Sequence, residues 1–392
     1  MSQIVIAGAA RTAIGGFQGA YTGIASPKLG AHAVDAAIKD AKVANDQIDE
    51  LMMGCVLPAG LGQAPARQAA LGADLPQSVP TSTVNKVCGS GMKTIMLAHD
   101  QLKAGNGDVI IAGGMESMTN APYLSPKTRS GARLGHVEMK DHMFFDGLED
   151  AYNADTLMGH FAEATAQKYQ FTREAQDEFA LTSLANATKA QESGAFEGEI
   201  SPYTVKTRKG ETLVDSDEQP KNARPDKIPQ LRPAFDPEGT VTAANSSSIS
   251  DGAAALVITT EDVAKEKGMN IRARILGHSS HAHEPEWFTT APVPAAQKLL
   301  DTLGWSVDEV DLWEVNEAFA VVPMAFMKEL GIERDKLNVN GGACALGHPI
   351  GASGARIVVT LLNALEKRDL KRGVAAICIG GGEGTALAIE RV

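Results

Sequence analysis

Two cysteines that lie far apart in the chain each occur beside glycines, Cys88 in Val-Cys-Gly-Ser-Gly-Met and Cys378 in Ile-Cys-Ile-Gly-Gly-Gly-Glu-Gly. Between them, His348 lies in a third glycine-rich segment, Gly-His-Pro-Ile-Gly-Ala-Ser-Gly. A thiol beside a histidine can act as a nucleophile, and a second thiol nearby can move a proton. These residues together predict acyl transfer through cysteine, including carbon–carbon bond formation on a thioester.

Cys88 follows an extended segment, residues 81–87, and precedes a helix that is predicted to start after Gly91. A thiol at a helix N-terminus lies in a positive potential, so we expect the pKa of Cys88 to fall toward reactive values. Gly89 and Gly91 have no Cβ, which lets a substrate and neighbouring backbone approach closely. The alternative is a buried structural cysteine, because free cysteine is one of the most buried residue types.

His348 and Cys378 each have a structural and a functional interpretation. Pro349 keeps His348 extended and outside the helix that begins near Gly351, so its ring can point into a cleft. An isolated histidine is more often structural, but the glycine-rich context favours a functional role. Cys378 lies in the strand-like segment 375–379, directly before three glycines, where a small apolar core residue is the alternative.

Asn316 is predicted to end a strand in the segment Trp-Glu-Val-Asn-Glu-Ala-Phe. Its amide could donate to an oxyanion, directly or through a water, or it could simply cap the strand. His278, His281 and His283 lie close together in the sequence, but no neighbouring acid or cysteine completes a metal-binding set. We therefore predict no metal site.

Composition and charge limit the classes of protein to which the chain can belong. Its 392 residues are 44% hydrophobic and 21% charged, which is typical of a globular protein with room for two cores. The net charge of −12 argues against a nucleic-acid partner, and no apolar segment is long enough to span a membrane. The first residues are typical of a strand rather than a signal peptide. Four cysteines without C-x-x-C spacing favour a cytoplasmic location, with Cys55 and Cys344 structural.

The chain contains two degenerate copies of one plan, in which short apolar strands alternate with helices. The corresponding segments are 4–8 and 271–277, 48–56 and 310–317, 88–92 and 351–355, 108–116 and 374–383, and 251–258 and 385–390. This pattern predicts an α/β fold whose sheets are covered by helices on both faces.

The repeat divides the chain into an N-terminal half, residues 1–268, and a C-terminal half, residues 269–392. Residues from about 119 to 250 interrupt the first copy and are predicted to form an inserted loop domain over the core. The longest predicted helix, Glu174 to Ser193, lies in this insertion, and Thr172 is its predicted N-cap.

The insertion is locally basic although the chain as a whole is acidic. Residues 121–140 hold four basic residues against one acidic residue, and residues 203–232 hold seven against five. Such a basic cap would suit a polyphosphate ligand, and ordinary solvated loop charge is the alternative.

Several motifs together resemble the signatures of the thiolase family, and the likeness extends from the first strand to Val392. The motifs are residues 84–93, 113–118, 316–319, 340–356 and 378–382. The resemblance implies the thiolase fold, with two similar α/β halves in a five-layered αβαβα core and an inserted loop domain. It also implies homodimers or homotetramers and acetyl-CoA C-acetyltransferase activity in fatty-acid metabolism, either condensing two acetyl-CoA or cleaving 3-ketoacyl-CoA.

The resemblance further implies roles for individual residues. Cys88 corresponds to the acyl-accepting nucleophile, His348 to its base and Cys378 to the acid/base for the second substrate. Asn316 corresponds to the holder of an oxyanion-hole water, and the N–H groups of Cys88 and Gly380 to a second oxyanion hole. The residues in regions that line the family's coenzyme A tunnel are Met158, Lys221, Phe235, Ala244, Ser247 and Phe319. Coenzyme A is implied as substrate and product, with no tightly bound cofactor and no metal.

The chain departs from the family pattern at a few positions. Leu157 stands where many biosynthetic members have histidine, which leaves the acyl-chain preference open. Lys221 stands where arginine is common, Cys344 where isoleucine is common, and Glu383 where methionine or glutamine is common.

Four other functions are alternatives to this one. The first is a degradative 3-ketoacyl-CoA thiolase with a broader substrate range. A decarboxylating ketoacyl synthase or a cysteine hydrolase would leave Cys378 without a role. A non-catalytic protein that binds coenzyme A or lipid on the same scaffold would not need Cys88, His348 and Cys378 intact.

Overall fold

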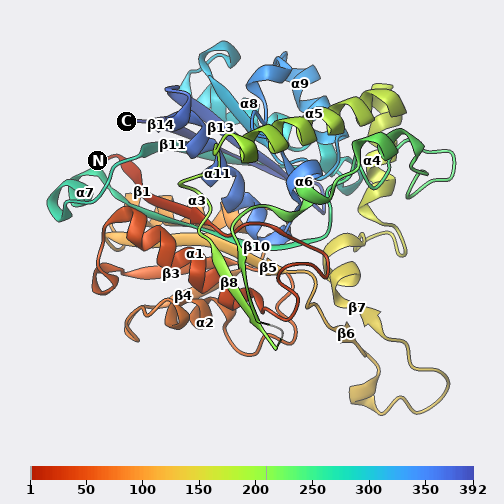
Figure 1. The fold of residues 1–392 in the computed structure, drawn as a ribbon, viewed down its shortest axis with the longest axis horizontal. Helices are drawn as coiled ribbons and strands as arrows, with labels where there is room; N and C mark the ends of the chain where they lie inside the picture. Colours follow the sequence, from red (N-terminus) through yellow and green to blue (C-terminus); the bar gives the residue numbers. More distant parts are fainter. Residues whose placement is uncertain (1, 209) are drawn as a thin grey trace.

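The computed structural model describes residues 2–208 and 210–392, and its core alternates strands with helices (Figure 1). The core strands are β1 (Ile4–Arg11), β2 (Gly15–Gly16), β3 (Glu50–Gly54), β4 (Thr81–Val84), β5 (Val109–Ser117), β10 (Ser250–Thr260), β11 (Ala273–Ala282), β12 (Leu312–Val315), β13 (Arg372–Ile379) and β14 (Glu383–Arg391). The core helices are α1 (Ser26–Ala41), α2 (Pro65–Gly72), α3 (Ser90–Lys103), α7 (Glu261–Lys267), α8 (Pro292–Leu303), α9 (Val321–Leu330), α10 (Ala343–Leu346) and α11 (Ile350–Lys367).

Ten strands form one mixed sheet whose order follows the same plan twice. The first half runs β1-β10-β5-β3-β4 and the second runs β11-β14-β13-β12. In the first half β5 is parallel to β3 and antiparallel to β10, and in the second β13 is parallel to β12 and antiparallel to β14. The two halves join where β1 and β11 pair antiparallel. The repeat seen in the sequence is therefore a repeat of topology.

Helices cover both faces of each half of the sheet, so that the core has five layers. α1 and α2 pack on the outer face of the first half around Val5 and Leu51, and α8 and α9 pack on the outer face of the second half around Trp313 and Val374. α3 and α11 lie between the two halves. Strands covered on both faces are expected to be apolar throughout, and every residue of β1 is buried. The predicted αβαβα order is confirmed.

The two central helices, α3 and α11, approach each other through glycines. A Cβ on Gly91 would lie 2.7 Å from the backbone nitrogen of Ala355, and a Cβ on Gly354 would lie 2.4 Å from the backbone nitrogen of Met92. Only glycine permits backbones to come this close. Cys88 precedes the start of α3 by two residues, and His348 precedes the start of α11 by two residues. Close packing of these first turns therefore brings the two side chains to one end of the core.

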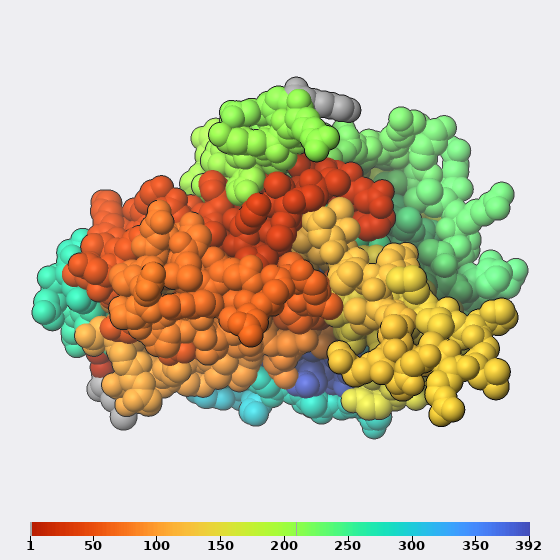
Figure 2. Space-filling model, turned by 90° about the horizontal axis from the view of Figure 1, so that it is seen from below, coloured from red at the N-terminus to blue at the C-terminus, as the bar shows by residue number. Residues whose placement is uncertain are grey.

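The inserted segment forms its own elements around the core (Figure 1). These are β6 (Tyr123–Leu124), β7 (Lys140–Asp141), α4 (Met158–Tyr169), α5 (Arg173–Glu192), β8 (Tyr203–Thr207), β9 (Gly210–Val214) and α6 (Glu218–Asn222). The longest predicted helix is α5, and its predicted N-cap is confirmed because Thr172 Oγ1 accepts from Ala175 N at 3.2 Å. Figure 2 shows the insertion, yellow to green, gathered beside the red and orange N-terminal segments. No helix in the described part of the chain is long and apolar enough to cross a membrane.

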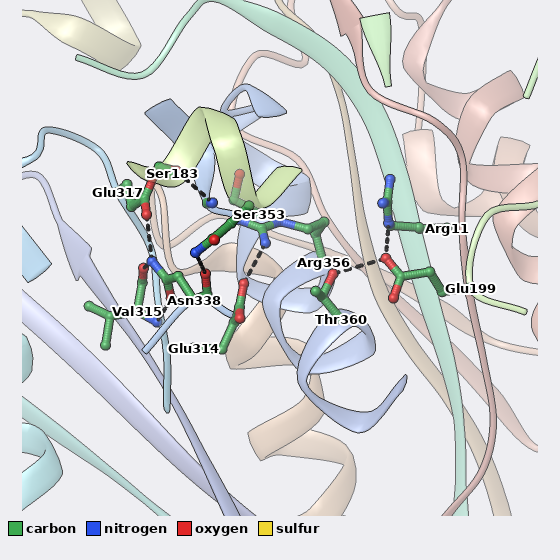
Figure 3. Close-up of polar contacts among 12 residues, drawn as sticks. Arg11, Ser183, Glu199, Glu314, Val315, Glu317, Asn338, Ser353, Arg356 and Thr360 are labelled. Atoms are coloured by element: carbon green, nitrogen blue, oxygen red, sulfur yellow. Dashed lines mark hydrogen bonds and ion pairs between the residues drawn. The ribbon is translucent and has the colours of Figure 1, made fainter. Parts of the chain in front are cut away.

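A buried ion-pair cluster anchors this insertion to the core. The guanidinium of Arg11, at the end of β1, donates to both carboxylate oxygens of Asp217 at 2.7 and 3.0 Å and to Glu199 at 2.6 Å. Glu199 also accepts from Thr360 Oγ1 of α11 at 3.1 Å (Figure 3). Arg11, Glu199 and Asp217 are all at most 1% exposed. Losing one member would leave an uncompensated buried charge, so the insertion is strongly tied to α11 and β1.

The close packing of α3 against α11 leads to a stability prediction. We expect Gly354→Ala to lower the free energy of unfolding by about 1–3 kcal/mol, because the new methyl group must displace the first turn of α3. Gly277→Ala is the matched control, since its Cβ would meet Leu299 Cδ1 at 3.5 Å, an ordinary contact distance. Urea unfolding of both variants beside the unmodified protein tests this, and equal stabilities would contradict the packing argument.

Candidate active site

A cavity of about 370 Å³ lies where the central helices begin, between the core and the insertion. Cys88, His348 and Gly380 line it, although they come from three segments that are remote in the sequence. Much of the remaining wall is apolar and comes from the insertion, including Met158 and Phe235. The structure thus places a thiol, an imidazole and a glycine backbone around one open cavity.

The backbone before Cys88 adopts an unusual conformation. Val87 has φ 45°, in the left-handed region, which is costly for a β-branched residue. A tight turn holds it there, since Gly89 N donates to Lys86 O at 3.0 Å and Ser90 Oγ donates to Val87 O at 2.6 Å. The strained turn presents Cys88 at the cavity, and the local sequence carried no signal for this conformation.

Burial shifts the pKa of Cys88 in the direction opposite to the one expected from the sequence. Desolvation raises the pKa of the thiol to about 11, while the backbone N–H groups of Gly380 and of Cys88 itself lower it and the carboxylate of Glu116 raises it. The prediction that the pKa of Cys88 falls toward reactive values is therefore wrong. The cost of a thiolate in an apolar cavity exceeds the stabilisation that these N–H groups supply.

His348 is buried and oriented through its own helix. Ser353 Oγ donates to Pro349 O at 3.0 Å, so this hydroxyl accepts from His348 Nδ1 at 2.6 Å. The hydrogen-bond network therefore assigns the proton to Nδ1 and leaves Nε2 as an acceptor. Nε2 is buried and has no partner among the described residues. Desolvation, together with the positive charge of Arg356, lowers the pKa of His348 to about 3, so the ring is neutral at physiological pH.

Cys378 and Asn316 lie at the carboxyl ends of two neighbouring parallel strands. Asn316 follows β12, and its N–H donates to Ala376 O of β13 at 3.0 Å. Cys378 is fully buried near the end of β13, and desolvation and the charge of Cys88 both raise its pKa well above the usual value. Cys378 itself does not line the cavity, but it precedes Gly380, which does, by two residues. Neither side-chain polar atom of Asn316 has a partner among the described residues, although both are buried.

A polar network on both sides of Asn316 fixes the end of β12 (Figure 3). Glu317 accepts from Ser183 Oγ of α5 at 2.7 Å and from Asn338 Nδ2 at 2.8 Å. Asn338 also bonds to both the N–H and the carbonyl of Val315, each at 2.8 Å. The backbone around Asn316 is therefore held by both the core and the insertion, while its own side chain stays unpaired.

Glu116 is a further buried residue beside the site, for which no role was predicted from the sequence. Its carboxylate accepts from Val56 N at 3.0 Å, Leu57 N at 3.2 Å and Gly351 N at 2.8 Å. Burial raises its pKa to about 7 despite these donors. Glu116 thus ties the first turn of α11 to the loop after β3. Its place in the Gly-Gly-Met-Glu motif was the available signal.

The residues predicted to contact coenzyme A fall into three groups. Those that line the cavity with Cys88 are Met158, Phe235, Ser247 and Phe319, and Leu157 joins them. Ala244 lines an adjoining cavity of about 280 Å³ together with Arg224 and Lys227, and Ala243 and Ser248 line both cavities. Lys221 is instead exposed on α6, where its ammonium donates to Ser216 Oγ.

The lowered pKa of His348 predicts a pH-dependent contribution to stability. An unfolded histidine binds a proton below about pH 6.5, whereas the folded one stays neutral down to about pH 3. The unfolded state therefore binds more protons in this window, and stability falls as the pH falls. Between pH 7 and pH 4.5, we expect the unmodified protein to lose about 3 kcal/mol more of its free energy of unfolding than His348→Asn loses.

Urea unfolding at pH 7 and pH 4.5 measures this effect. His136→Asn, which replaces an exposed imidazole in the loop between β6 and β7, serves as the control and should keep the full loss of the unmodified protein. If His348→Asn loses as much stability as the control, the neutral buried imidazole is ruled out.

Known proteins resemble this chain over its whole length. Residues 4–262 match the thiolase N-terminal domain and residues 269–391 match the thiolase C-terminal domain. The acetyl-CoA acetyltransferase of Pseudomonas aeruginosa is 48% identical and the alignment covers 100% of both chains. Acetyl-CoA acetyltransferase 2 of Arabidopsis thaliana is 50% identical, with 99% of this chain and 96% of the relative covered.

Solved structures agree with the sequence comparison. The crystal structure of the Bacillus anthracis acetyl-CoA acetyltransferase matches with a TM-score of 0.97 at 41% identity, covering 100% of this chain and 99% of the other. A thiolase from Ascaris suum in complex with coenzyme A matches with a TM-score of 0.94 at 41% identity, covering 100% of both chains. Sequence similarity over the full length and a shared five-layered core lead to one conclusion, which is that this chain belongs to the thiolase family.

Proposed function

We propose that this chain is an acetyl-CoA C-acetyltransferase that condenses two acetyl-CoA into acetoacetyl-CoA and coenzyme A, and catalyses the reverse thiolysis. The observation that carries the proposal is the convergence of Cys88, His348 and Gly380 on one cavity, with Cys378 near the end of β13, two residues before Gly380. The names of its relatives in Pseudomonas and Arabidopsis support the same activity.

In the first half-reaction, Cys88 Sγ attacks the thioester carbonyl while its proton passes to His348 Nε2. A neutral thiol and a neutral imidazole are the resting forms, so the thiolate is formed only as the new S–C bond is made. The N–H groups of Cys88 and Gly380 stabilise the oxyanion. The C–S bond to coenzyme A then breaks, and Cys378 protonates the departing thiolate, which leaves acetyl-Cys88 and a Cys378 thiolate.

In the second half-reaction, the Cys378 thiolate removes the α-proton of a second acetyl-CoA. Burial makes this thiolate a strong base, because the same desolvation that raises its pKa disfavours the charged form. Asn316, through a bound water, and His348 stabilise the enolate oxygen. The enolate carbon attacks the acetyl-Cys88 carbonyl, the C–S bond to Cys88 breaks, and the proton held by His348 returns to Sγ.

Coenzyme A is proposed to bind across the two adjoining cavities. The pantetheine arm would follow the apolar wall of the first cavity, which includes Met158, Phe235 and Phe319. The phosphates would lie toward the second cavity, where Arg224 and Lys227 supply positive charge. No metal or tightly bound cofactor enters either half-reaction.

We also propose a homodimer or homotetramer in the cytoplasm. β4 lies at the end of the sheet and pairs only with β3 among the described strands, which leaves its other edge for a second copy. The loop between β6 and β7 exposes Leu134 and Met139.

All four cysteines are free, as expected in a reducing compartment. The proposed division into halves at residues 268 and 269 places the boundary between α7 and β11.

The different roles of the two thiols predict different effects when each is replaced by serine. Cys378→Ser should still allow acetylation of Cys88 by acetyl-CoA, although more slowly, because a thiolate can leave without an acid beside it. It should reduce condensation and thiolysis much more, by about 10²–10⁴-fold, because the α-proton step loses its base. Cys88→Ser should abolish both half-reactions. Mass spectrometry of the acetylated protein measures the first step, and acetoacetyl-CoA thiolysis measures the whole cycle.

Cys55→Ser is the matched control, because this buried cysteine lines neither of the two cavities and takes no part in either half-reaction. It should retain both acetylation and thiolysis. Equal loss of the two steps in Cys378→Ser would reject the proposed roles of the thiols.

Substrate comparison distinguishes the proposed activity from its alternatives. We expect kcat/KM for thiolysis to be highest with acetoacetyl-CoA and to fall as the 3-ketoacyl chain lengthens, because an apolar wall that includes Leu157 limits the cavity. A maximum at long chains would instead indicate a degradative thiolase. Binding of coenzyme A without any turnover would indicate a non-catalytic protein.

A further inference from the structure

Two histidines and an aspartate from separate elements converge near the end of the central helix α3. His99 Nδ1 and His278 Nε2 lie 3.0 and 2.8 Å from the same oxygen, Asp100 Oδ1. His99 and Asp100 belong to α3, and His278 belongs to β11. The sequence predicted no metal set around His278, because the histidines near it in the chain have no acid beside them. The acid is supplied from α3.

Small movements would convert the arrangement of these groups into part of the first coordination sphere of a transition metal. The imidazole rings lie nearly perpendicular, at 87° with centroids 5.1 Å apart, and one nitrogen of each faces the shared carboxylate oxygen. One ligand atom from each of the three residues lies within 4.8 Å of the other two. Tetrahedral zinc with bonds of about 2.0–2.1 Å separates its ligand atoms by about 3.3 Å, so shifts of about 0.5 Å open each N–O contact to this value.

The burial of these side chains favours a cation that is bound by ordered protein ligands and keeps one coordination position open to solvent. The side chains of His99 and His278 are only 12% and 16% exposed, whereas Asp100 is 55% exposed, so the site is held by the protein and reached from solvent. A metal binds imidazole in its neutral form, so two imidazole ligands and one carboxylate would bring a net charge of −1 to the ion. The neighbouring Lys103 directs its ammonium to Ser2 O at 3.1 Å. Imidazole nitrogen with carboxylate oxygen suits zinc better than magnesium or calcium.

We propose that His99, Asp100 and His278 form a binding site for a divalent zinc-like metal ion. The ion would take the place of the protons now shared among these groups and join the last turns of α3 to β11. It would thus stabilise the contact between α3 and β11, the strand at which the second half of the sheet meets the first. The site stands apart from the catalytic cavity, because Cys88 precedes the first turn of α3 and His99 lies on its later turns.

Zinc titration of the full-length protein tests this proposal. Cys88→Ser serves as the background, because a thiol and an imidazole in the catalytic cavity could bind zinc themselves. After removal of metal with EDTA and of any affinity tag, we expect one equivalent of Zn²⁺ to bind in competition with a chromophoric chelator. The midpoint of thermal unfolding should rise with Zn²⁺ concentration, because a ligand of the folded state stabilises it.

Variants of the ligands decide where the ion binds. Asp100→Asn and His278→Asn should each raise the dissociation constant by at least about tenfold and remove the thermal shift. His281→Asn, on the same strand, is the matched control and should bind as the background does. Asp100→Asn alters a largely exposed side chain, so its fold is expected to persist even if His278→Asn is unstable. Unchanged zinc affinity in Asp100→Asn, or no binding by the background protein, would reduce the cluster to a hydrogen-bonded triad and overturn the proposal.

Discussion

The close approach of α3 and α11 is the constraint on which the rest of the structure depends. The helices meet through backbone at Gly91 and Gly354, where no side chain larger than hydrogen fits. Because Cys88 and His348 directly precede these first turns, the distance between the helices sets the geometry of the thiol and the imidazole. The same packing places both in a layer that is covered by the two halves of the sheet. Precision at the cavity is therefore a consequence of core packing rather than of the loops around it.

Burial determines which acid–base forms the site can use. Both thiols have raised pKa values and the imidazole a lowered one, so the three groups are neutral before a substrate arrives. In the proposed reaction, charge then develops only as bonds form and break, and the N–H groups of Cys88 and Gly380 would stabilise it. Such an arrangement protects the thiols from unselective reaction in the free protein and strengthens Cys378 as a base once it has given up its proton.

Buried polar contacts connect the insertion to the core at two places. Arg11 binds Glu199 and Asp217 of the insertion, and Glu199 reaches α11 through Thr360. Ser183 of α5 reaches Glu317, which follows Asn316. The insertion forms most of the cavity wall, so these contacts fix the position of the wall relative to Cys88 and His348. Breaking either contact would lower the free energy of unfolding strongly, because it would leave a buried charge or polar group without its partner.

Much of the fold and of the site is encoded in local patterns. Apolar strands that alternate with helices, and glycine motifs repeated in the same order, were sufficient to predict two similar α/β halves and the inserted segment. The motifs around Cys88 and His348 selected residues that line one cavity, and the motif of Cys378 contains Gly380, which lines it as well. The first turns of helices and the ends of strands lie at the same edge of such folds. Thr172 was likewise predicted as an N-cap from its local sequence, and it caps α5.

Other properties depend on neighbours that local sequence does not identify. The raised pKa of Cys88 results from the apolar cavity around it, which outweighs the backbone donors at the helix start. The pairing of Arg11 with Asp217, and of His278 with Asp100, joins residues far apart in the chain. Sequence alone determined the elements and the chemistry that their side chains can perform. Tertiary structure decided the protonation states and the partners, because desolvation and Coulomb interactions depend on distances in space rather than on positions along the chain.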